Sequence, residues 1–267
     1  MSPTSEDRHP HGETRSEAVD GRILVMTVDR VEKKNALTPK IVKELTNALT
    51  KLDDDPDLFV GVLTFAGPHA TAGLDLPLFF GDGSDGPQTD RAQVDPFGLR
   101  RRLTKPLITA VQGITFTAGI EIGLAGDIII AASDTRFSQL EPRRGLAPLG
   151  GATIRYVQRC GWGNAMYHLL RADEFDAAEA LRIGLIQEVV EPGRQAERAV
   201  ELARDVLQGS PPALRHTIAN ARLALEEGEP AAIAAIPAMA RAVQATDDFT
   251  EGIASFIERR PAHFTGR

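Results

Sequence analysis

The feature that most constrains the fold is an alternation of short apolar runs with stretches of helical periodicity before Leu149. The apolar runs are rich in β-branched residues and predict buried strands. Strands that alternate with helices favour an α/β architecture with crossover connections. The predicted strands span 23–29, 59–65, 107–111 and 127–132, and the predicted helices span about 39–52 and 118–124.

Beyond Leu149 the periodicity becomes mostly helical, with one short strand predicted at 186–190. We therefore predict a core over residues 19–200 and a helical C-terminal region over 201–267. The polar start lacks the apolar segment of a signal peptide, so residues 1–18 are expected to form a disordered tail. The segment 81–95 is rich in Gly, Asp and Pro and is expected to be a mobile surface excursion. The C-terminal helices are predicted near 153–161, 162–170, 177–183, 195–208, 212–225, 230–240 and 247–259.

Composition excludes several classes of function. A net charge of -7 argues against nucleic acid or an anionic membrane as a main partner. The longest apolar stretch, near Ile120–Ala132, contains Glu121 and is too short to span a bilayer. The single cysteine, Cys160, excludes an internal disulfide, fits a cytoplasmic location and is expected to serve packing. No Cys/His cluster or Gly-rich phosphate loop is present, so neither a metal nor a separate cofactor is expected.

Two glutamates, Glu121 and Glu141, stand out because each lies in an apolar, glycine-rich setting. A carboxylate is costly to bury alone, so a Glu in such a run needs a partner or a chemical role. Two carboxylates that converge on one pocket are suited to paired acid and base chemistry. Taken alone, Glu121 also fits a first-turn acid that the helix dipole favours.

Two loops that follow predicted strands could supply backbone amides to the same pocket. The loop Thr71-Ala-Gly-Leu-Asp-Leu76 has small residues that let amides approach a ligand closely. The segment 112–121 follows a strand and opens a helix, whose first amides are unpaired and suit an oxygen that gains negative charge. Together the loops could form a two-amide oxyanion hole.

Five blocks in this order resemble the crotonase superfamily, the enoyl-CoA hydratase/isomerase family. The similarity covers residues 21–267, nearly everything but the tail. The matching blocks are Asn35-Ala36-Leu37; Thr71-Ala72-Gly73-Leu74-Asp75-Leu76; Ala110-Val111-Gln112-Gly113 with Thr117-Ala118-Gly119-Ile120-Glu121-Ile122; Phe137-Ser138-Gln139-Leu140-Glu141 with Gly145-Leu146-Ala147-Pro148 and Gly151-Ala152-Thr153; and Phe256-Ile-Glu-Arg-Arg-Pro-Ala-His-Phe-Thr-Gly-Arg267.

The resemblance implies a spiral core of ββα turns and a helical C-terminal trimerisation region, assembled as a homotrimer or a dimer of trimers. It implies acyl-CoA thioester substrates, with coenzyme A as part of the substrate. By position, the oxyanion amides would be those of Leu74 and Ala118. Because hydratases of the family have glutamate at both acidic positions, we expect an enoyl-CoA hydratase. The alternatives are a Δ3-Δ2 isomerase, a hydrolase, a decarboxylase or a weakly active acyl-CoA-binding relative.

In the implied mechanism Glu141 delivers a proton to the α-carbon, while Glu121 orients and deprotonates the water that attacks the β-carbon. Lys33, with its neighbour Lys34, and Arg259 or Arg260 are candidates to meet the CoA phosphates, the C-terminal pair from a neighbouring subunit. Lysines such as Lys33 and Lys34 more often form a solvated face than a phosphate site, and Asp75 fits a helix cap. The substrate-binding residues expected are Lys33, Asn35, Ala36, Ala72, Gly73, Asp75, Leu76, Gly119, Arg259 and Arg260.

The sequence departs from the family pattern at both ends of the expected site. Thr117 and Ala118 replace glycines, and a methyl group at the oxyanion position narrows the pocket. Arg143 and Arg144 follow Glu141, and two guanidinium groups facing that carboxylate would lower its pKa.

Overall fold

The computed structural model describes residues 10–81 and 90–267. Half of the predicted N-terminal tail and the middle of the predicted excursion at 81–95 therefore lie outside the described residues. Within the described part of the tail, β1 (Glu13–Val19) pairs antiparallel with β2 (Ile23–Asp29). Disorder is thus the wrong expectation for residues 13–18. As an edge strand, β1 leaves most of its side chains in solvent, so it needs no apolar pattern.

The five predicted strands all occur in one six-stranded sheet of order β1-β2-β3-β4-β6-β9. Every pair from β2 to β9 is parallel. All six residues of β3 are buried, as expected for a central strand covered on both faces. The remaining strands of this sheet are β3 (Val60–Phe65), β4 (Leu107–Val111), β6 (Ile128–Ala132) and β9 (Glu188–Val190).

A second, three-stranded sheet has the order β5-β7-β8, with β5 (Ile114–Phe116) parallel to β7 (Arg136–Ser138). β8 (Phe175–Asp176) pairs antiparallel with β7. Each of β5 and β7 follows a strand of the main sheet and precedes a helical turn, which gives the chain successive ββα turns. These strands have only two or three residues, too few for a periodic sequence signal, and they were not predicted.

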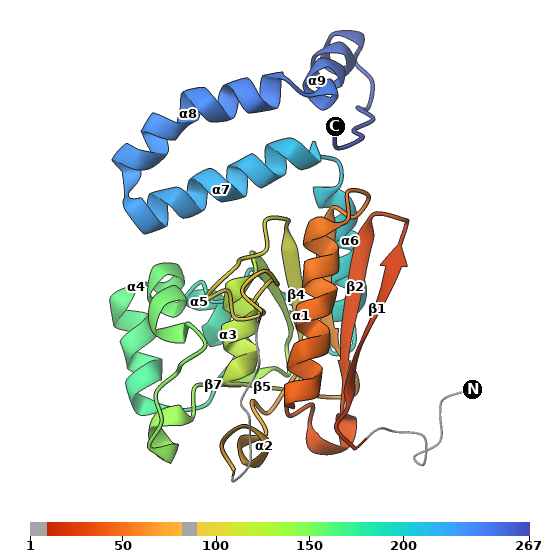
Figure 1. Ribbon diagram of the computed structural model, residues 1–267. Helices are drawn as coiled ribbons and strands as arrows, with labels where there is room; N and C mark the ends of the chain where they lie inside the picture. The colour runs from red at the N-terminus through yellow and green to blue at the C-terminus, as the bar shows by residue number, and fades with distance from the viewer. Residues whose placement is uncertain (1–9, 82–89) are drawn as a thin grey trace, which may run out of the picture.

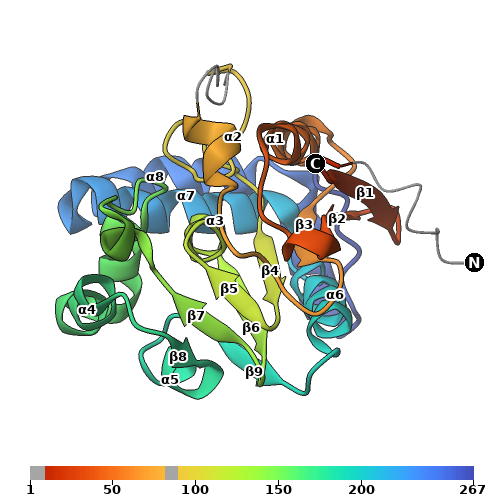
Figure 2. The same ribbon diagram turned by 90° about the horizontal axis from the view of Figure 1, so that it is seen from below.

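Helices cover both faces of the main sheet (Figures 1 and 2). α1 (Pro39–Asp54) begins as predicted, with Thr38 Oγ1 accepting the Ile41 N–H at 3.2 Å. Its apolar face packs on one side of the sheet, and α6 (Gln195–Val206) packs on the other through Ala199 and Ala203. α6 thus continues past residue 200, where the sequence placed the end of the core.

The remaining helices of the core lie between its later strands. α3 (Ala118–Ala125) matches its prediction. The short α2 (Leu76–Phe80) begins after Asp75, which the sequence offered as a helix cap, although the Asp75 side chain makes no capping hydrogen bond. The two helices predicted at 153–161 and 162–170 form α4 (Ala152–Arg171), which breaks at Gly161 with φ 74°. α5 (Ala177–Arg182) and the 3₁₀ turns η2 (Val31–Lys33) and η3 (Glu141–Arg144) complete this part of the chain.

The last three helices form a layer across one end of the core, away from α2 (Figure 1). α7 (Pro211–Glu227) and α8 (Glu229–Gln244) form a hairpin, and α9 (Asp247–Glu258) follows. Arg222 ties α7 to the core, because its guanidinium donates to the Leu103 carbonyl and to Asp127. α8 and α9 expose large apolar side chains: Ile233, Ile236, Phe249, Ile253, Phe256 and Ile257.

Candidate active site

One cavity of about 510 Å³ lies where α2, α3, η3 and the segment 95–100 meet. Glu121 and Glu141 both line it, so the two carboxylates that the sequence singled out converge. The predicted oxyanion residues Leu74 and Ala118 and the predicted substrate-binding residues Ala72 and Leu76 line it as well. Most of the remaining wall is apolar: Val42, Phe79, Phe80, Phe97, Leu99, Leu140, Leu146, Ala147 and Leu149.

Glu121 is fixed by backbone hydrogen bonds from the start of the next helical segment. The residue lies in the first turn of α3 and is only 4% exposed. Its Oε1 accepts the N–H of Gly150 at 2.7 Å and of Ala152 at 3.2 Å. Burial raises the pKa of Glu121, while the two amides and the positive charge of Arg155 act against that increase. The carboxylate is thus held in one orientation toward the cavity.

Glu141 begins η3 and is half-buried. Burial, with a contribution from the negative charge of Glu121, raises the pKa of Glu141 to about 7. The buried Gln139 amide, turned so that its nitrogen faces the carboxylate, lies 3.2 and 3.1 Å from Oε1 and Oε2. A carboxyl group with a pKa near neutrality can both donate and accept a proton at physiological pH.

The sequence left open whether Arg143 and Arg144 face Glu141 and lower its pKa; the pKa of Glu141 is raised instead. The Arg143 guanidinium donates to the Arg171 carbonyl at 3.1 Å. Arg144 lines the cavity but is exposed to solvent, which weakens its electrostatic effect. Burial of the Glu141 carboxyl group has the largest effect on its pKa, and the sequence does not show this burial.

The amide N–H groups of Leu74 and Ala118 have no hydrogen-bond partner among the described residues. Leu74 forms a parallel bridge with Leu37, in which Leu37 bonds to the Gly73 carbonyl and the Asp75 amide. This pattern turns the Leu74 N–H away from Leu37. Ala118 is the first residue of α3, whose first amides have no acceptor within the helix. Both amides are therefore available to a ligand oxygen.

Close packing holds these two amide-bearing segments together. Thr117 has φ 47°, which is unusual for a β-branched residue. Gly73 faces Thr117 so closely that a Cβ at Gly73 would collide with Thr117 Oγ1. A Cβ at Gly119 would lie 2.6 Å from Thr71 Cγ2. Gly73 and Gly119 thus permit the approach of two loops.

Asn35 and Asp75 support the loops through protein contacts. Buried Asn35 accepts the Arg30 N–H at 2.7 Å and donates to the carbonyls of Ala66 and His69, each at 2.8 Å. Asp75 forms an ion pair with Arg30 at 2.7 Å. Ala36 belongs to the same network, because its carbonyl accepts from Arg30 at 3.0 Å.

The basic residues predicted to meet CoA lie outside the cavity lining. Lys33 ends the exposed turn η2. Arg260 pairs with Glu251 and Glu258, and Arg259 follows α9 in the left-handed conformation. α9 lies at the opposite end of the molecule from α2 (Figure 1). Within one chain, these arginines are therefore not brought to the carboxylates.

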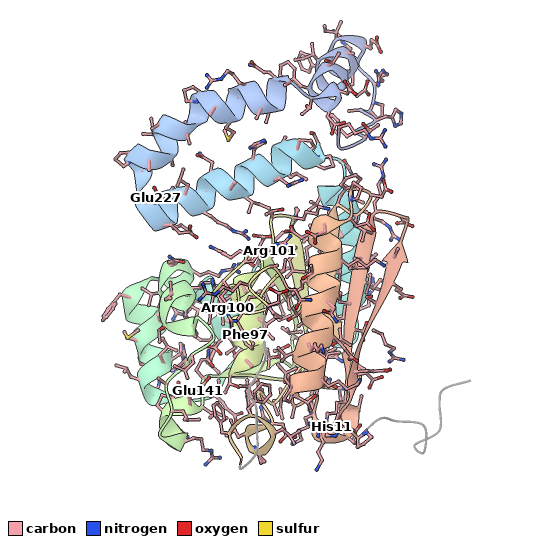
Figure 3. The ribbon with its side chains drawn as sticks, viewed as in Figure 1. His11, Phe97, Arg100, Arg101, Glu141 and Glu227 are labelled. Atoms are coloured by element: carbon pink, nitrogen blue, oxygen red, sulfur yellow. The ribbon has the colours of Figure 1, made fainter. Side chains whose placement is uncertain are left out.

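Sequence reasoning missed the segment 95–100, which forms one wall of the cavity. Asp95 shapes it by accepting the amides of Phe97 at 3.0 Å and Leu99 at 3.1 Å. Arg155 on α4 donates to the carbonyls of Phe97 at 2.7 Å and Gly98 at 2.5 Å. Figure 3 shows Phe97 and Arg100 together between α1 and α4. The spacing from Asp95 to Phe97 and Gly98 was the available turn signal.

The described residues do not support a metal site, a membrane-spanning helix or a reactive cysteine. No group of three or more His, Cys, Asp or Glu side chains that could hold a metal ion occurs in 10–81 and 90–267. No helix in those ranges is both long and apolar enough to cross a bilayer. Cys160 is buried, and burial raises the pKa of its thiol to about 12, which fits the predicted packing role.

Known proteins are similar to this chain in both sequence and fold. A model of the enoyl-CoA hydratase/isomerase family matches residues 18–267. The chain is 33% identical over 255 residues to the enoyl-CoA hydratase EchA19 of Mycobacterium tuberculosis, with 92% of this chain and 94% of that protein covered.

Two crystal structures are also similar. A probable enoyl-CoA hydratase/isomerase from Mycobacterium abscessus has a TM-score of 0.91 and 40% identity, with 95% of this chain and 98% of that chain covered. An enoyl-CoA hydratase from Mycobacterium tuberculosis H37Rv has a TM-score of 0.85 and 31% identity, with 96% and 99% covered.

The ββα turns and the shared cavity define an α/β enzyme of the crotonase type. The chain belongs to the enoyl-CoA hydratase/isomerase family. The predicted family and fold class are thereby confirmed.

Proposed function

We propose that the protein is an enoyl-CoA hydratase that adds water across the 2,3 double bond of a 2-enoyl-CoA thioester. The observation that carries this proposal is the convergence of Glu121 and Glu141 on a cavity that also contains two unpaired amides, those of Leu74 and Ala118. The name of the EchA19 relative agrees with it. Coenzyme A enters as part of the substrate, as the sequence predicts.

In the proposed reaction the thioester oxygen accepts hydrogen bonds from the Leu74 and Ala118 amides. These bonds polarise the conjugated double bond and stabilise the enolate-like state; losing one such donor typically costs about 10²–10³ in rate. Glu121 takes a proton from water while the water oxygen bonds to the β-carbon, and Glu141 gives a proton to the α-carbon. Transfer of a proton from Glu121 back to Glu141 restores the pair.

The raised pKa of Glu141 supports this division of roles. A carboxyl group with a pKa near 7 retains a proton to donate at neutral pH. Burial raises the pKa of Glu121 as well, but two amide hydrogen bonds and the charge of Arg155 oppose that increase and favour the ionised form, which suits Glu121 to accept a proton. Two adjacent carboxylates that repel one another favour a state with a single proton between them.

The test is hydration of trans-2-butenoyl-CoA, followed by loss of the conjugated absorbance and by mass spectrometry. Glu121→Gln and Glu141→Gln should each lower kcat by about 10²–10⁴-fold, the range typical of general acid–base groups. Glu174→Gln is a matched control, because this exposed residue pairs with Arg136 on the surface. Near-normal turnover in either active-site variant would contradict the assignment. A 3-enoyl-CoA substrate separates hydration from isomerisation.

We further propose that the chain assembles as a homotrimer or a dimer of trimers. The support is the apolar surface of α8 and α9, where Phe256 is 83% and Ile257 is 72% exposed. Light scattering coupled to size exclusion would measure the mass. A monomer at micromolar concentration would overturn this proposal without affecting the assigned reaction.

A further inference from the structure

Three charged side chains line the cavity besides the two glutamates: Asp95, Arg100 and Arg144. Asp95 already serves the protein, because its two oxygens accept the backbone amides of Phe97 and Leu99. It is also 7% exposed at its side chain, so little of its charge faces the cavity. The charges that remain for a ligand are the two guanidinium groups.

Arg100 and Arg144 differ from the arginines around them. Arg100 Nε lies 3.9 Å from Asp95 Oδ2, beyond hydrogen-bond distance. Among the described residues, the Arg144 side chain has no hydrogen-bond or ion-pair partner, and the residue is exposed. The neighbouring arginines all have protein acceptors: Arg101 with Asp53 and Asp54, Arg102 with Glu226, Arg143 with the Arg171 carbonyl, and Arg155 with two backbone carbonyls.

The wall near these two arginines is apolar. Arg100 follows Leu99, and Arg144 lies two residues before Leu146; both leucines line the cavity. A methyl-ended acyl chain gains nothing from a guanidinium group and shields it from water. A carboxylate would accept two parallel hydrogen bonds from the planar guanidinium fork. The wall therefore suits an acyl group with a hydrocarbon middle and an anionic end.

We propose that Arg144, assisted by Arg100, binds a carboxylate at the distal end of the acyl group, so that the preferred substrates are 2-enoyl-CoA esters of dicarboxylic acids. This proposal rests on the proposed function, since it assigns the substrate class of the same cavity. Arg144 is the specificity-determining residue and takes no part in the proton transfers.

The position of Arg144 relative to Glu141 gives the geometric reason. The two residues are three apart in the 3₁₀ turn η3, and side chains at this spacing lie on the same side of such a turn. An acyl group whose α-carbon meets Glu141 therefore lies in the same cavity as the Arg144 side chain. Arg100 reaches this cavity from the segment 95–100, whose backbone Arg155 and Asp95 hold in place.

Equilibrium binding tests this without requiring turnover. Calorimetry would compare glutaryl-, adipyl- and suberyl-CoA with the neutral pentanoyl-, hexanoyl- and octanoyl-CoA. The unmodified protein should bind at least one carboxylated ester about 10- to 100-fold tighter than its neutral counterpart, the range of hydrogen bonds to charged groups. Arg144→Gln should remove most of this preference, and Arg100→Gln part of it. Arg143→Gln is the matched control and should leave the preference intact.

Two results would overturn the proposal. One is equal affinity of the unmodified protein for carboxylated and neutral esters at all three lengths. The other is a loss of affinity in Arg144→Gln that is equal for both kinds of ester, which would mean that the arginine meets the CoA phosphates.

A turnover arm with the matching 2-enoyl-CoA esters separates this proposal from the proposed function. A retained binding preference without hydration would sink the hydratase assignment alone. Hydration of neutral and carboxylated esters with equal kcat/KM, together with equal affinities, would sink the substrate class alone.

Discussion

Glu121 Oε1 accepts the N–H of Gly150 at 2.7 Å, which joins the first turn of α3 to the segment that leads into α4. The two residues are 29 positions apart, and Ala152 adds a second amide at 3.2 Å. The carboxylate that we propose to act in catalysis is thus positioned by backbone groups, which no side-chain motif encodes. Gly150 fits here because a Cβ at this position would collide with Glu121 Oε2.

Gly150→Ala is expected to lower kcat at least tenfold, because the added methyl group displaces the Glu121 carboxylate and misplacement of a catalytic group by about 1 Å can cost 10²-fold. Steady-state hydration of trans-2-butenoyl-CoA measures the effect. Gly163→Ala is the control, since a Cβ there meets nothing within 4 Å. This helical position should gain up to about 1 kcal/mol of stability. Equal kcat in the two variants would show that Glu121 tolerates the displacement.

The hydration rate should fall as the pH rises through about 7. Burial raises the pKa of Glu141 to about 7, so below that pH the group is mostly protonated and able to donate. Above it, kcat/KM for hydration should decline about tenfold per pH unit. Water addition releases no net proton, so the ratio of kcat/KM for hydration to kcat/KM for dehydration equals a pH-independent equilibrium constant. Dehydration of the 3-hydroxyacyl-CoA should therefore show the same decline above about pH 7. A kcat/KM for hydration that stays constant from about pH 6 to 9 would contradict the assigned role of Glu141.

Gln139→Leu should shift the decline of kcat/KM for hydration to higher pH. The Gln139 amide nitrogen lies 3.2 and 3.1 Å from the two Glu141 oxygens, where it favours the ionised carboxylate. The amide hydrogen bond lowers the pKa of Glu141 and burial raises it. Without the amide donor, the pKa of Glu141 should therefore increase further. The pH dependence of kcat/KM measures the shift. Gln158→Leu changes an exposed residue of α4 and should leave the profile in place; an unmoved limb in Gln139→Leu would mean the amide does not contact Glu141 in solution.

Arg155 is expected to have two separable effects. Arg155→Gln should raise KM about tenfold or more, because the Phe97 and Gly98 carbonyls lose a charged donor worth about 1.5–3 kcal/mol each. The positive charge of Arg155 also acts to lower the pKa of Glu121. Without this charge the pKa of Glu121 should rise, so the acid limb of the kcat/KM profile, where activity falls as Glu121 becomes protonated, should move to higher pH.

Arg155→Lys separates these effects, since it retains the charge but not the paired donors. It should raise KM and leave the acid limb near its original pH. Arg136→Gln, which affects an exposed pair with Glu174, is the control. An unchanged KM in Arg155→Gln would show that the segment 95–100 keeps its position without this arginine.

Much of the fold was predictable because its central elements carry strong local signals. β3 is apolar throughout, and α1 combines the Thr38 cap, a first-turn Pro39 and a regular apolar face. The missed elements, such as β1 and β5, are polar edge strands or too short to show a period. Pairing with neighbours that are distant in sequence stabilises them, and a local pattern cannot reveal that pairing.

The sequence by itself determined the α/β class, the resemblance to the family with the ββα spiral that it implies, and the pair Glu121 and Glu141, because motifs and hydrophobic periodicity are local properties of the chain. Tertiary structure alone decided that the carboxylates share a cavity, that amides of Gly150 and Ala152 hold one of them, and that the pKa of the other lies near 7. Burial sets that pKa, and it overrides the nearby Arg143 and Arg144 because one guanidinium bonds elsewhere and the other is in solvent. Burial and orientation arise from contacts between distant segments, which only the folded chain brings together.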